Sequence, residues 1–327
     1  MKVAPLTMAA SRVKTRICMI SDTHTFVPSA RYKQFRSAYK WPFPAADILL
    51  HAGDITLVGK QEEHQVMVDM LKRANAELKI VIAGNHDITL DKEYYNEYGY
   101  RRHRTSEKQD LAKIRELYCG EEAQKHGIAY MDEGLRNFTL KNGARFTVYA
   151  SPYQPKFCQW AFAYKRSQDR FNPSPEGAEF QAENPIPSFP GVDIVLTHGP
   201  PKDIGDKVAQ ERSEGCAHLR RAVARARPRI HCFGHIHEGH GAYLMKWDKE
   251  GKEEEEEEEG STTFQQDREA ELDNGYAYID LSHESNKPLR EGEETLFVNA
   301  AVVTRLYEPL NAPWLIDIDL PTSVAKK

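Results

Sequence analysis

Five short clusters of metal-ligating residue types, each placed just after an apolar run, constrain this chain more than any other feature. They are Asp22-Thr23-His24, Gly53-Asp54, Gly84-Asn85-His86-Asp87, Thr197-His198-Gly199 and Gly234-His235-Ile236-His237. Residues at the carboxyl ends of successive strands gather at one edge of an open α/β sheet. The ordered set therefore predicts one site, built from oxygen and imidazole donors, that can hold two metal ions.

The alternation of apolar runs, ligand clusters and helical segments predicts an α/β fold. The runs that precede the clusters and indicate strands cover 16–20, 47–50, 79–83, 192–196 and 229–233. Helical spacing over 61–74 places Val66, Met70 and Leu71 on one face.

Further strands are expected in the second half of the chain. Asn142-Gly143 lies between two apolar runs and is a strong signal for a β-hairpin. Residues 216–226 have the pattern of a basic amphipathic helix. Closing strands are expected over 243–247, 296–303 and 314–318.

The chain has 327 residues, of which 40% are hydrophobic, so a single large domain with a substantial core can form. We expect that domain to span 15–321, interrupted by an acidic low-complexity insertion over 249–294. The insertion contains the run Glu253–Glu259, and such a composition is typical of a disordered, solvated segment. An acidic partner-binding arm is the alternative, and 276–281 can form a short strand inside it.

Charge and cysteine usage narrow the class of protein. The net charge is −5, and outside the acidic run the chain is close to neutral with no basic stripe, so no nucleic-acid groove is predicted. No apolar run of about 18 residues predicts a membrane span. The five cysteines form no C-x-x-C pair, which indicates reduced thiols in a cytoplasmic or nuclear compartment. A transit peptide for an organelle is the alternative for the basic start of the chain.

The ligand clusters divide into two groups that share one carboxylate. The first group is predicted to consist of Asp22, His24, Asp54 and His237. The second is predicted to consist of Asp54, Asn85, His198 and His235. Asp54 can bridge two ions because a carboxylate has two oxygens, and Gly53 lets the backbone approach closely.

Mixed nitrogen and oxygen ligation without a thiolate suits Mn, Fe, Zn, Co or Ni, and the sequence leaves the choice among them open. Two ions about 3.5–4 Å apart clamp both ends of an in-line displacement at phosphorus. A water between them loses a proton near neutral pH and serves as the nucleophile. The site therefore points to an enzyme that hydrolyses a small-molecule phosphate ester.

His86 is left without a metal in this assignment. It follows the predicted ligand Asn85, which places its side chain near the leaving group. An imidazole can donate a proton to a leaving alkoxide near neutral pH, so His86 is predicted to be the general acid. Asp87 is predicted to fix its tautomer, as carboxylates do for catalytic histidines.

Together these motifs resemble the calcineurin-like metallophosphoesterase superfamily, and within it the small metallophosphoesterase-domain-containing branch, which is similar to class III cyclic-nucleotide phosphodiesterases. The resemblance spans about 15–321 apart from the insertion, and Ala150-Ser151-Pro152-Tyr153-Gln154-Pro155 adds to it. It implies a four-layer αββα sandwich, in which two stacked mixed sheets are flanked by helices. It also implies hydrolysis of phosphomonoesters or phosphodiesters, with nucleotides, including cyclic nucleotides, among the expected substrates.

Departures from neighbouring families narrow this expectation. Ala83 and the segment after Asp54 lack the arginines with which protein Ser/Thr phosphatases grip phosphate bidentately. Leu57 stands where purple acid phosphatases have a tyrosine. His235 is retained, whereas some members of the small branch lack it and are poor catalysts. These features favour a phosphodiesterase with a complete two-metal site.

Substrate contacts are predicted from single residues. Trp160, within the aromatic segment 154–164, is a candidate wall of a pocket for a base, with a position in the core as the favoured alternative. Arg212 and His240 are candidate phosphate contacts, with a solvated surface role as the alternative. His51 is expected to orient a metal ligand rather than bind metal.

The sequence thus favours a dinuclear metallophosphodiesterase, with manganese among the candidate metals. A phosphomonoesterase, including a protein phosphatase, is the enzymatic alternative. A catalytically weak scaffold of the same fold that binds nucleotide is the non-enzymatic one. The physiological substrate, the native metals and the oligomeric state are left open.

Overall fold

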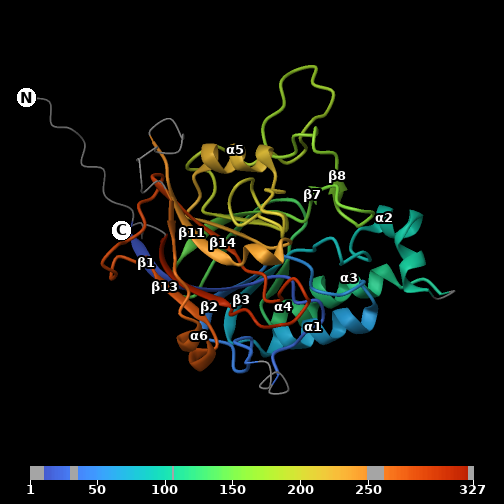
Figure 1. The fold of residues 1–327 in the computed structure, drawn as a ribbon, viewed down its shortest axis with the longest axis horizontal. Coiled ribbons are helices and arrows are strands. Elements are labelled where there is room, and N and C mark those ends of the chain that lie inside the picture. Colours follow the sequence, from blue (N-terminus) through green and yellow to red (C-terminus); the bar gives the residue numbers. More distant parts are fainter. Residues whose placement is uncertain (1–10, 30–35, 105–106, 249–260, 323–327) are drawn as a thin grey trace, which may run out of the picture.

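Two stacked sheets carry the functional strand ends in this structure, a computed structural model that describes residues 11–29, 36–104, 107–248 and 261–322 (Figure 1). In the first sheet, Ile48, Leu49 and Leu50 are buried in succession, because both faces of a largely parallel sheet are covered. Its six strands lie in the order β13 (Ala277–Asp280), β15 (Trp314–Pro321), β1 (Arg12–Ile20), β2 (Ala46–His51), β3 (Ala76–Val81) and β4 (Ile128–Tyr130). Strands β1 to β4 run parallel, and β15 runs antiparallel to β1.

The second sheet is also mixed. Its seven strands lie in the order β12 (Ser261–Thr263), β11 (Gly241–Lys246), β14 (Glu294–Asn299), β10 (Ile230–Phe233), β9 (Ile194–Thr197), β6 (Arg145–Ser151) and β5 (Gly134–Thr139). The four strands from β14 to β6 run parallel to one another. A separate pair consists of β7 (Gln154–Pro155) and β8 (Ala163–Tyr164).

The predicted hairpin is confirmed at β5 and β6, which pair antiparallel with Thr139 opposite Arg145. Gly143 adopts a φ of 93°, a left-handed conformation that glycine tolerates best. The Asn142 side chain accepts a hydrogen bond from the Ala144 amide at 2.9 Å and closes the turn.

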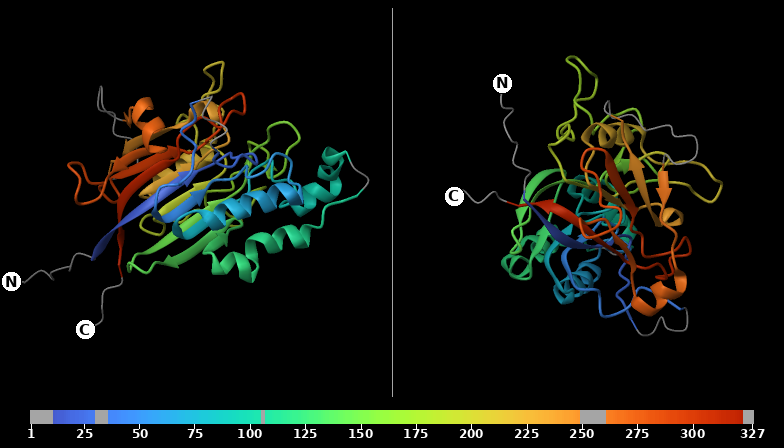
Figure 2. Two further views of the ribbon diagram at one scale, coloured as in Figure 1. Left: turned by 90° about the horizontal axis from the view of Figure 1, so that it is seen from below. Right: turned by 90° about the vertical axis from the view of Figure 1, so that its left-hand side faces the viewer.

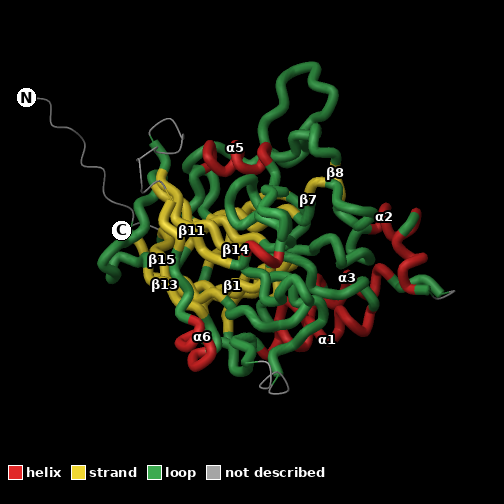
Figure 3. The backbone as a smooth tube through the Cα atoms, viewed as in Figure 1, coloured by secondary structure: helices red, strands yellow, loops and turns green. Residues whose placement is uncertain are grey.

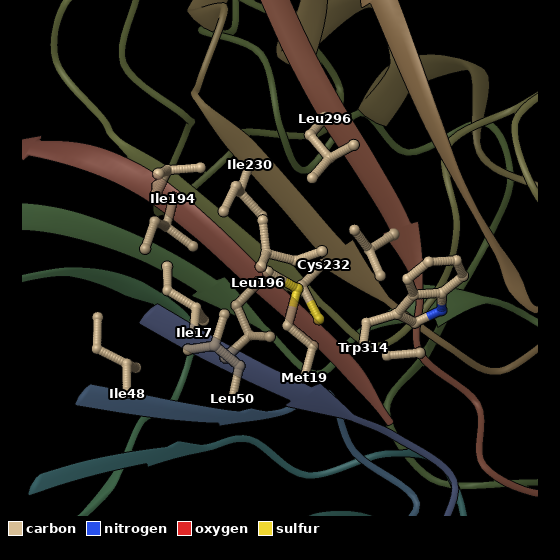
Figure 4. Close-up of a cluster of buried hydrophobic side chains, with 14 of the residues drawn as sticks. Ile17, Met19, Ile48, Leu50, Ile194, Leu196, Ile230, Cys232, Leu296 and Trp314 are labelled. Atoms are coloured by element: carbon tan, nitrogen blue, oxygen red, sulfur yellow. The ribbon is translucent and has the colours of Figure 1, made fainter. Parts of the chain in front are cut away.

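Buried aliphatic side chains fill the space between the two sheets (Figure 4). Ile17, Met19 and Leu50 point from the first sheet towards Leu196 and Cys232 of the second. Alternate positions along each strand face this layer. The two sheets are therefore held together by an apolar core that extends towards the strand ends.

Helices cover the outer face of the first sheet. They are α1 (Gln61–Arg73), α3 (Leu111–Cys119) and α4 (Glu121–Lys125). Met70 and Leu71 of α1 pack in a buried cluster with Leu49 and Val81 of the sheet. Val66, which was predicted on the same face, is instead 42% exposed.

The outer face of the second sheet is covered by α5 (Ala217–Ala226), whose Leu219 and Val223 pack against Val195 and Phe297. Figures 1 and 2 show α5 and the helix group α1, α3 and α4 on opposite sides of the strands. Figure 3 shows the strands gathered in the centre and the helices at the periphery. The predicted αββα layering is thus confirmed.

Short helices complete the described chain. They are α2 (Lys92–Glu97), η2 (Gly99–His103), η3 (His237–Gly239) and α6 (Arg268–Asn274). No helix among the described residues combines the length and apolarity that crossing a bilayer requires.

The expected disordered insertion over 249–294 needs correction. Residues 261–280 contain β12, α6 and β13, and β13 pairs in parallel with β15 at the sheet edge. Ala277, Ile279 and Leu281 alternate with polar residues and are buried, so a period of two specifies a strand within a charge-rich segment. The acidic run Glu253–Glu259 lies outside the described residues.

Truncation of Leu196 tests the layer between the sheets. Leu196→Ala is expected to lower the free energy of unfolding by about 2–5 kcal/mol, because it leaves a cavity in this core. Urea denaturation measures the change. Leu135→Ala, at a side chain that is 51% exposed in the same sheet, serves as the control and should stay within about 0.5 kcal/mol of the parent. Equal losses in the two variants would contradict the assigned layer.

Candidate metal centre

The loops after five strands bring the predicted ligands together. Asp22 and His24 follow β1, Asp54 follows β2, and Asn85 follows β3 of the first sheet. The other loops belong to the second sheet and carry His198 after β9 and His235 and His237 after β10. Both sheets therefore contribute to one site from the carboxyl ends of parallel strands, as the sequence predicts.

One group of donors consists of Asp22, His24 and His237, whose ligand-type atoms all lie within 4.8 Å of one another. The Nε2 atoms of the two histidines are 3.3 Å apart. His237 Nε2 is also 3.3 Å from an Asp22 carboxylate oxygen. Nitrogen and oxygen donors thus converge on one point.

The other group consists of Asp54, His198 and His235, again with donor atoms within 4.8 Å of one another. The Asn85 side-chain oxygen joins it at 2.9 Å from His198 Nε2. Asp54 lies between the groups, with one carboxylate oxygen 3.4 Å from His198 Nε2 and the other 3.8 Å from His24 Nε2.

The backbone is tightly folded around these donors. The positive φ angles of Asp22, His24, Asp54 and His235 lie between 42° and 68°, and each such conformation costs about 1–3 kcal/mol in a non-glycine residue. A Cβ atom on Gly84 would collide with Asp54 and would come within 2.6 Å of His198 Cε1.

Glycines at two further points allow the same close approach. A Cβ on Gly234 would collide with the Asp22 carboxylate, and one on Gly53 would lie 2.6 Å from the Ala83 carbonyl oxygen. The predicted reason for Gly53 is therefore confirmed. The glycines of the clusters are required by contacts between loops of different strands.

Backbone carbonyl groups fix the orientation of three imidazole rings. Nδ1 of His86 donates to the Leu57 carbonyl at 2.7 Å, and Nδ1 of His198 donates to the Ala52 carbonyl at 3.0 Å. Nδ1 of His237 lies 3.2 Å from the Thr304 carbonyl. Because a carbonyl can only accept, Nε2 is left as the nitrogen that faces the site, an arrangement typical of metal-binding histidines.

Burial and charge set the protonation of the donors. Burial lowers the pKa of His24 and that of His235 to about 3 each, which keeps both imidazoles neutral. Burial acts against the charged form of Asp54, but His198 and His86 hold the pKa of this carboxyl well below its usual value. Burial likewise opposes protonation of His198, yet Asp54 raises its pKa to about 9.

These donors fit a pair of divalent metal ions. Neutral imidazoles and ionised carboxylates are the forms that bind metal, and Nε2 of His24 lies only 3.3 Å from Nε2 of His237. The buried Nδ1 of His24 has no hydrogen-bond partner among the described residues. A metal ion that binds near His198 takes the place of its proton. The donors of these groups are nitrogen and oxygen atoms, without a thiolate.

His86 lies beside the donors of both groups. Its ring nitrogen lies within 4.8 Å of a ring nitrogen of His24 and of a carboxylate oxygen of Asp54. Its ring stacks on Trp160 with 4.0 Å between centroids, and the Arg102 guanidinium lies 3.7 Å from the Trp160 ring centre. Trp160 also packs against the buried cluster that contains Leu49 and Val81, so the structure places it in the core position predicted as the alternative to a base pocket.

The predicted contact between Asp87 and His86 is also wrong. The Asp87 carboxylate accepts hydrogen bonds from the amides of Ile55, Thr56 and Gly84 and from the Thr56 hydroxyl, at 2.7–3.1 Å. These donors outcompete the imidazole because buried amides require an acceptor. Asp87 therefore ties the loop after β2 to the loop after β3.

A cavity of about 550 Å³ opens beside the donors. Asp54, Asn85, His86, His235 and His237 line it. The predicted phosphate contact Arg212 lines it as well.

His240 is not among the residues that line this cavity. Its ring nitrogens contact the Ala312 carbonyl at 3.0 Å and the Gln266 amide at 2.9 Å, and the ring stacks on Trp314. The expected role of His240 as a phosphate contact is therefore wrong, because both of its polar atoms serve the packing of the loop.

His51 supports the loops rather than a ligand side chain. Its Nε2 lies 2.9 Å from the Thr23 hydroxyl, and its Nδ1 is 3.3 Å from the Gly53 amide nitrogen. His51 therefore lies next to the site, as predicted. Its partners, however, are residues that flank the metal-ligand candidates, not a ligand side chain.

Tyr307 was not predicted. Its ring centroid is 4.8 Å from that of His24 and 5.1 Å from that of His237, and it lines the cavity. It lies in an irregular loop without periodicity, so no local pattern in the sequence signals its position.

With the fold and the donor geometry established, the class of protein follows. The chain belongs to the calcineurin-like phosphoesterase family, whose model matches residues 15–239. That range contains all seven predicted metal ligands.

Two of the relatives are named after a metallophosphoesterase domain. The human and mouse proteins called metallophosphoesterase domain-containing protein 1 are each 30% identical over 316 residues, which cover 94% of this chain and 72% of the relative. The Caenorhabditis elegans UPF0046 protein T07D4.2 is 34% identical over 204 residues, which cover 61% of this chain and 48% of that protein.

Gly84→Ala tests the close approach of the two loops. The added methyl collides with Asp54, so metal content after loading with Mn²⁺ is expected to fall by at least about half. Elemental analysis of the purified protein, with circular dichroism as the check on folding, measures this. Gly177→Ala, where the φ of 78° strains an alanine but its Cβ meets nothing within 4 Å, is the control for backbone strain without a collision. Unchanged metal content in Gly84→Ala would contradict the packing described.

Proposed function

We propose that this chain hydrolyses phosphodiesters at a centre of two divalent metal ions. The position of Asp54 carries the proposal, because its two oxygens face Nε2 of His198 at 3.4 Å and Nε2 of His24 at 3.8 Å. A shared carboxylate between two donor groups is what a two-metal hydrolase requires. Membership of the calcineurin-like phosphoesterase family supports the same chemistry.

The two donor groups divide the ligands as the sequence predicts. We assign one ion to Asp22, His24, Asp54 and His237, and the other to Asp54, Asn85, His198 and His235. When bound, the ions supply positive charge to the reacting phosphate and activate a water molecule. The chain holds the donors for both ions on rigid strand ends, so the phosphate meets a site that is already formed.

We assign the general-acid role to His86. Its Nδ1 proton is engaged by the Leu57 carbonyl, so in the imidazolium form, which is protonated on both nitrogens, Nε2 carries the proton that passes to the leaving oxygen. The stack of Trp160 and Arg102 holds the plane of the ring. Asp87 assists indirectly, because it fixes the two loops between which the imidazole lies.

A diester is favoured over a monoester by the residues that flank the ligands. Ala83 is buried and apolar, and Leu57 contributes its carbonyl to His86 while its side chain is exposed. Neither supplies the fixed cation that binds the extra charge of a monoester. A diester has a single negative charge at the scissile phosphorus, which two metal ions alone can neutralise.

Hydrolysis of two chromogenic esters tests the proposal. Protein stripped of metal and reloaded with Mn²⁺ is expected to hydrolyse bis-p-nitrophenyl phosphate faster than p-nitrophenyl phosphate. Asp54→Ala removes the shared ligand and should lower kcat/KM by at least about 100-fold, since loss of even a supporting contact to a metal ligand costs 10–100-fold. Asp132→Ala, at an exposed ion pair with Arg115, is the control.

Preference for the monoester would transfer the assignment to the phosphomonoesterases. Failure to hydrolyse either ester with two metals bound would favour a nucleotide-binding protein of the same fold. Activity that survives in Asp54→Ala would exclude the site described.

The general-acid role predicts a dependence on the leaving group. His86→Ala should lower kcat by about 10²–10⁴-fold for a dinucleoside monophosphate, whose alkoxide needs a proton. It should have a much smaller effect on bis-p-nitrophenyl phosphate, because p-nitrophenolate leaves without protonation. Rates with both substrates and metal content are measured, with His283→Ala at an exposed histidine as control. Equal losses on the two substrates would exclude the proton-donor role.

A further inference from the structure

The cavity beside the metal centre has more positive charge than a simple diester requires. Four cationic side chains line it, namely Lys156, Arg166, Arg212 and Arg305. They come from loops outside the ligand clusters, after β7, after β8, before α5 and after β14. The donors for metal therefore occupy one part of the cavity wall and an independent set of cations another.

Carboxylates neutralise only part of this charge. Glu214 lies 2.8 Å from Arg166 and 3.5 Å from Arg212, and Glu238 lies 3.9 Å from Arg305. These are the two carboxylates of the lining outside the metal ligands.

Lys156 has no carboxylate within 4.0 Å among the described residues. Four cations against two carboxylates leave the wall positive even before metal binds. A concave surface with an excess of one charge concentrates ligands of the opposite charge. The charge on the scissile diester is already matched by the metal ions, so the wall is suited to a second anionic group.

An exposed aromatic side chain lies next to these cations. Phe157 follows Lys156, lines the cavity, and is 60% exposed. Its ring centroid is 6.2 Å from that of His235. Exposed aromatic rings beside cations are the elements with which proteins bind nucleotide bases and phosphates together.

The size of the cavity limits the ligand. Its volume of about 550 Å³ lies in the range of small-molecule sites, about 300–1,000 Å³. A nucleotide with two phosphates fits this range, whereas a folded protein surface does not enter such a space.

We propose that the substrate is a nucleotide phosphodiester that carries a second phosphate, with this phosphate bound by Lys156 and Arg212 and the base placed against Phe157. The inference rests on the proposed function, since the scissile phosphate occupies the metal centre. It adds a binding subsite and a substrate class to that function.

A matched pair of substrates tests the subsite. Thymidine 5′-(p-nitrophenyl phosphate) is compared with the same ester carrying a 3′-phosphate, using full-length protein loaded with Mn²⁺. The ester with the second phosphate should have a kcat/KM at least about tenfold higher, the effect of one charge-assisted contact. Lys156→Gln and Arg212→Gln should each remove most of this preference, because each lowers kcat/KM for the ester that carries the second phosphate.

Lys207→Gln is the matched control. Lys207 belongs to the same loop region as Arg212, pairs with Glu211 at 3.3 Å, and does not line this cavity. Its substitution should leave the preference intact. If Lys207→Gln also lost the preference, the effect would come from general surface charge, and the subsite would be overturned.

Binding measurements separate failure of the subsite from failure of the proposed function. Calorimetry with thymidine 3′,5′-bisphosphate and thymidine 5′-monophosphate requires no turnover, and the bisphosphate should bind at least about tenfold more tightly. Turnover of both esters at equal rates, or equal affinity for the two nucleotides, overturns the subsite. Tighter binding of the bisphosphate without hydrolysis of either ester supports the subsite and overturns the proposed diesterase activity.

Discussion

The two carboxylate oxygens of Asp54 set the main constraint on this fold. One faces His24, from the first sheet, and the other faces His198, from the second. The ends of strands in different sheets must therefore stay within a few ångströms of each other. The apolar layer between the sheets provides this alignment, since close-packed side chains resist sliding of one sheet over the other (Figure 4). The positions of the metal-ligand residues therefore depend on the packing of the core.

This alignment also accounts for the unusual backbone around the donors. Left-handed conformations at Asp22, His24, Asp54 and His235 are individually unfavourable. They persist because the strands before them are fixed on both faces by the core, and because Asp87 joins two of the loops through amide hydrogen bonds. The surroundings hold the ligands in place before metal arrives, so binding requires little rearrangement.

Much of the fold and nearly the whole donor set could be predicted, since apolar runs, turn residues and ligand residue types leave local signals. The same rules failed where a contact depends on the path of the chain. A carboxylate after a histidine suggested an orienting pair, but Asp87 meets amides from another loop. Trp160 was predicted to lie in a base pocket or in the core, and its contact with Arg102, distant in sequence, could not be foreseen. The strand β13 was expected within the charge-rich insertion, whereas β12 and α6 were not, because their charged and polar residues show no clear apolar period.

The imidazoles of His86, His198 and His237 are all oriented by main-chain carbonyl groups. Every amino acid carries that acceptor, so the orientation of these rings depends on the loop conformation at residues 52, 57 and 304 and not directly on the side chains there. A substitution that keeps the loop conformation leaves the tautomers of the three histidines unchanged, whereas an insertion or deletion that shifts the loop disturbs them. In this centre, the support for these three imidazoles is encoded in loop length and shape, and comparison of residue identities alone underestimates it.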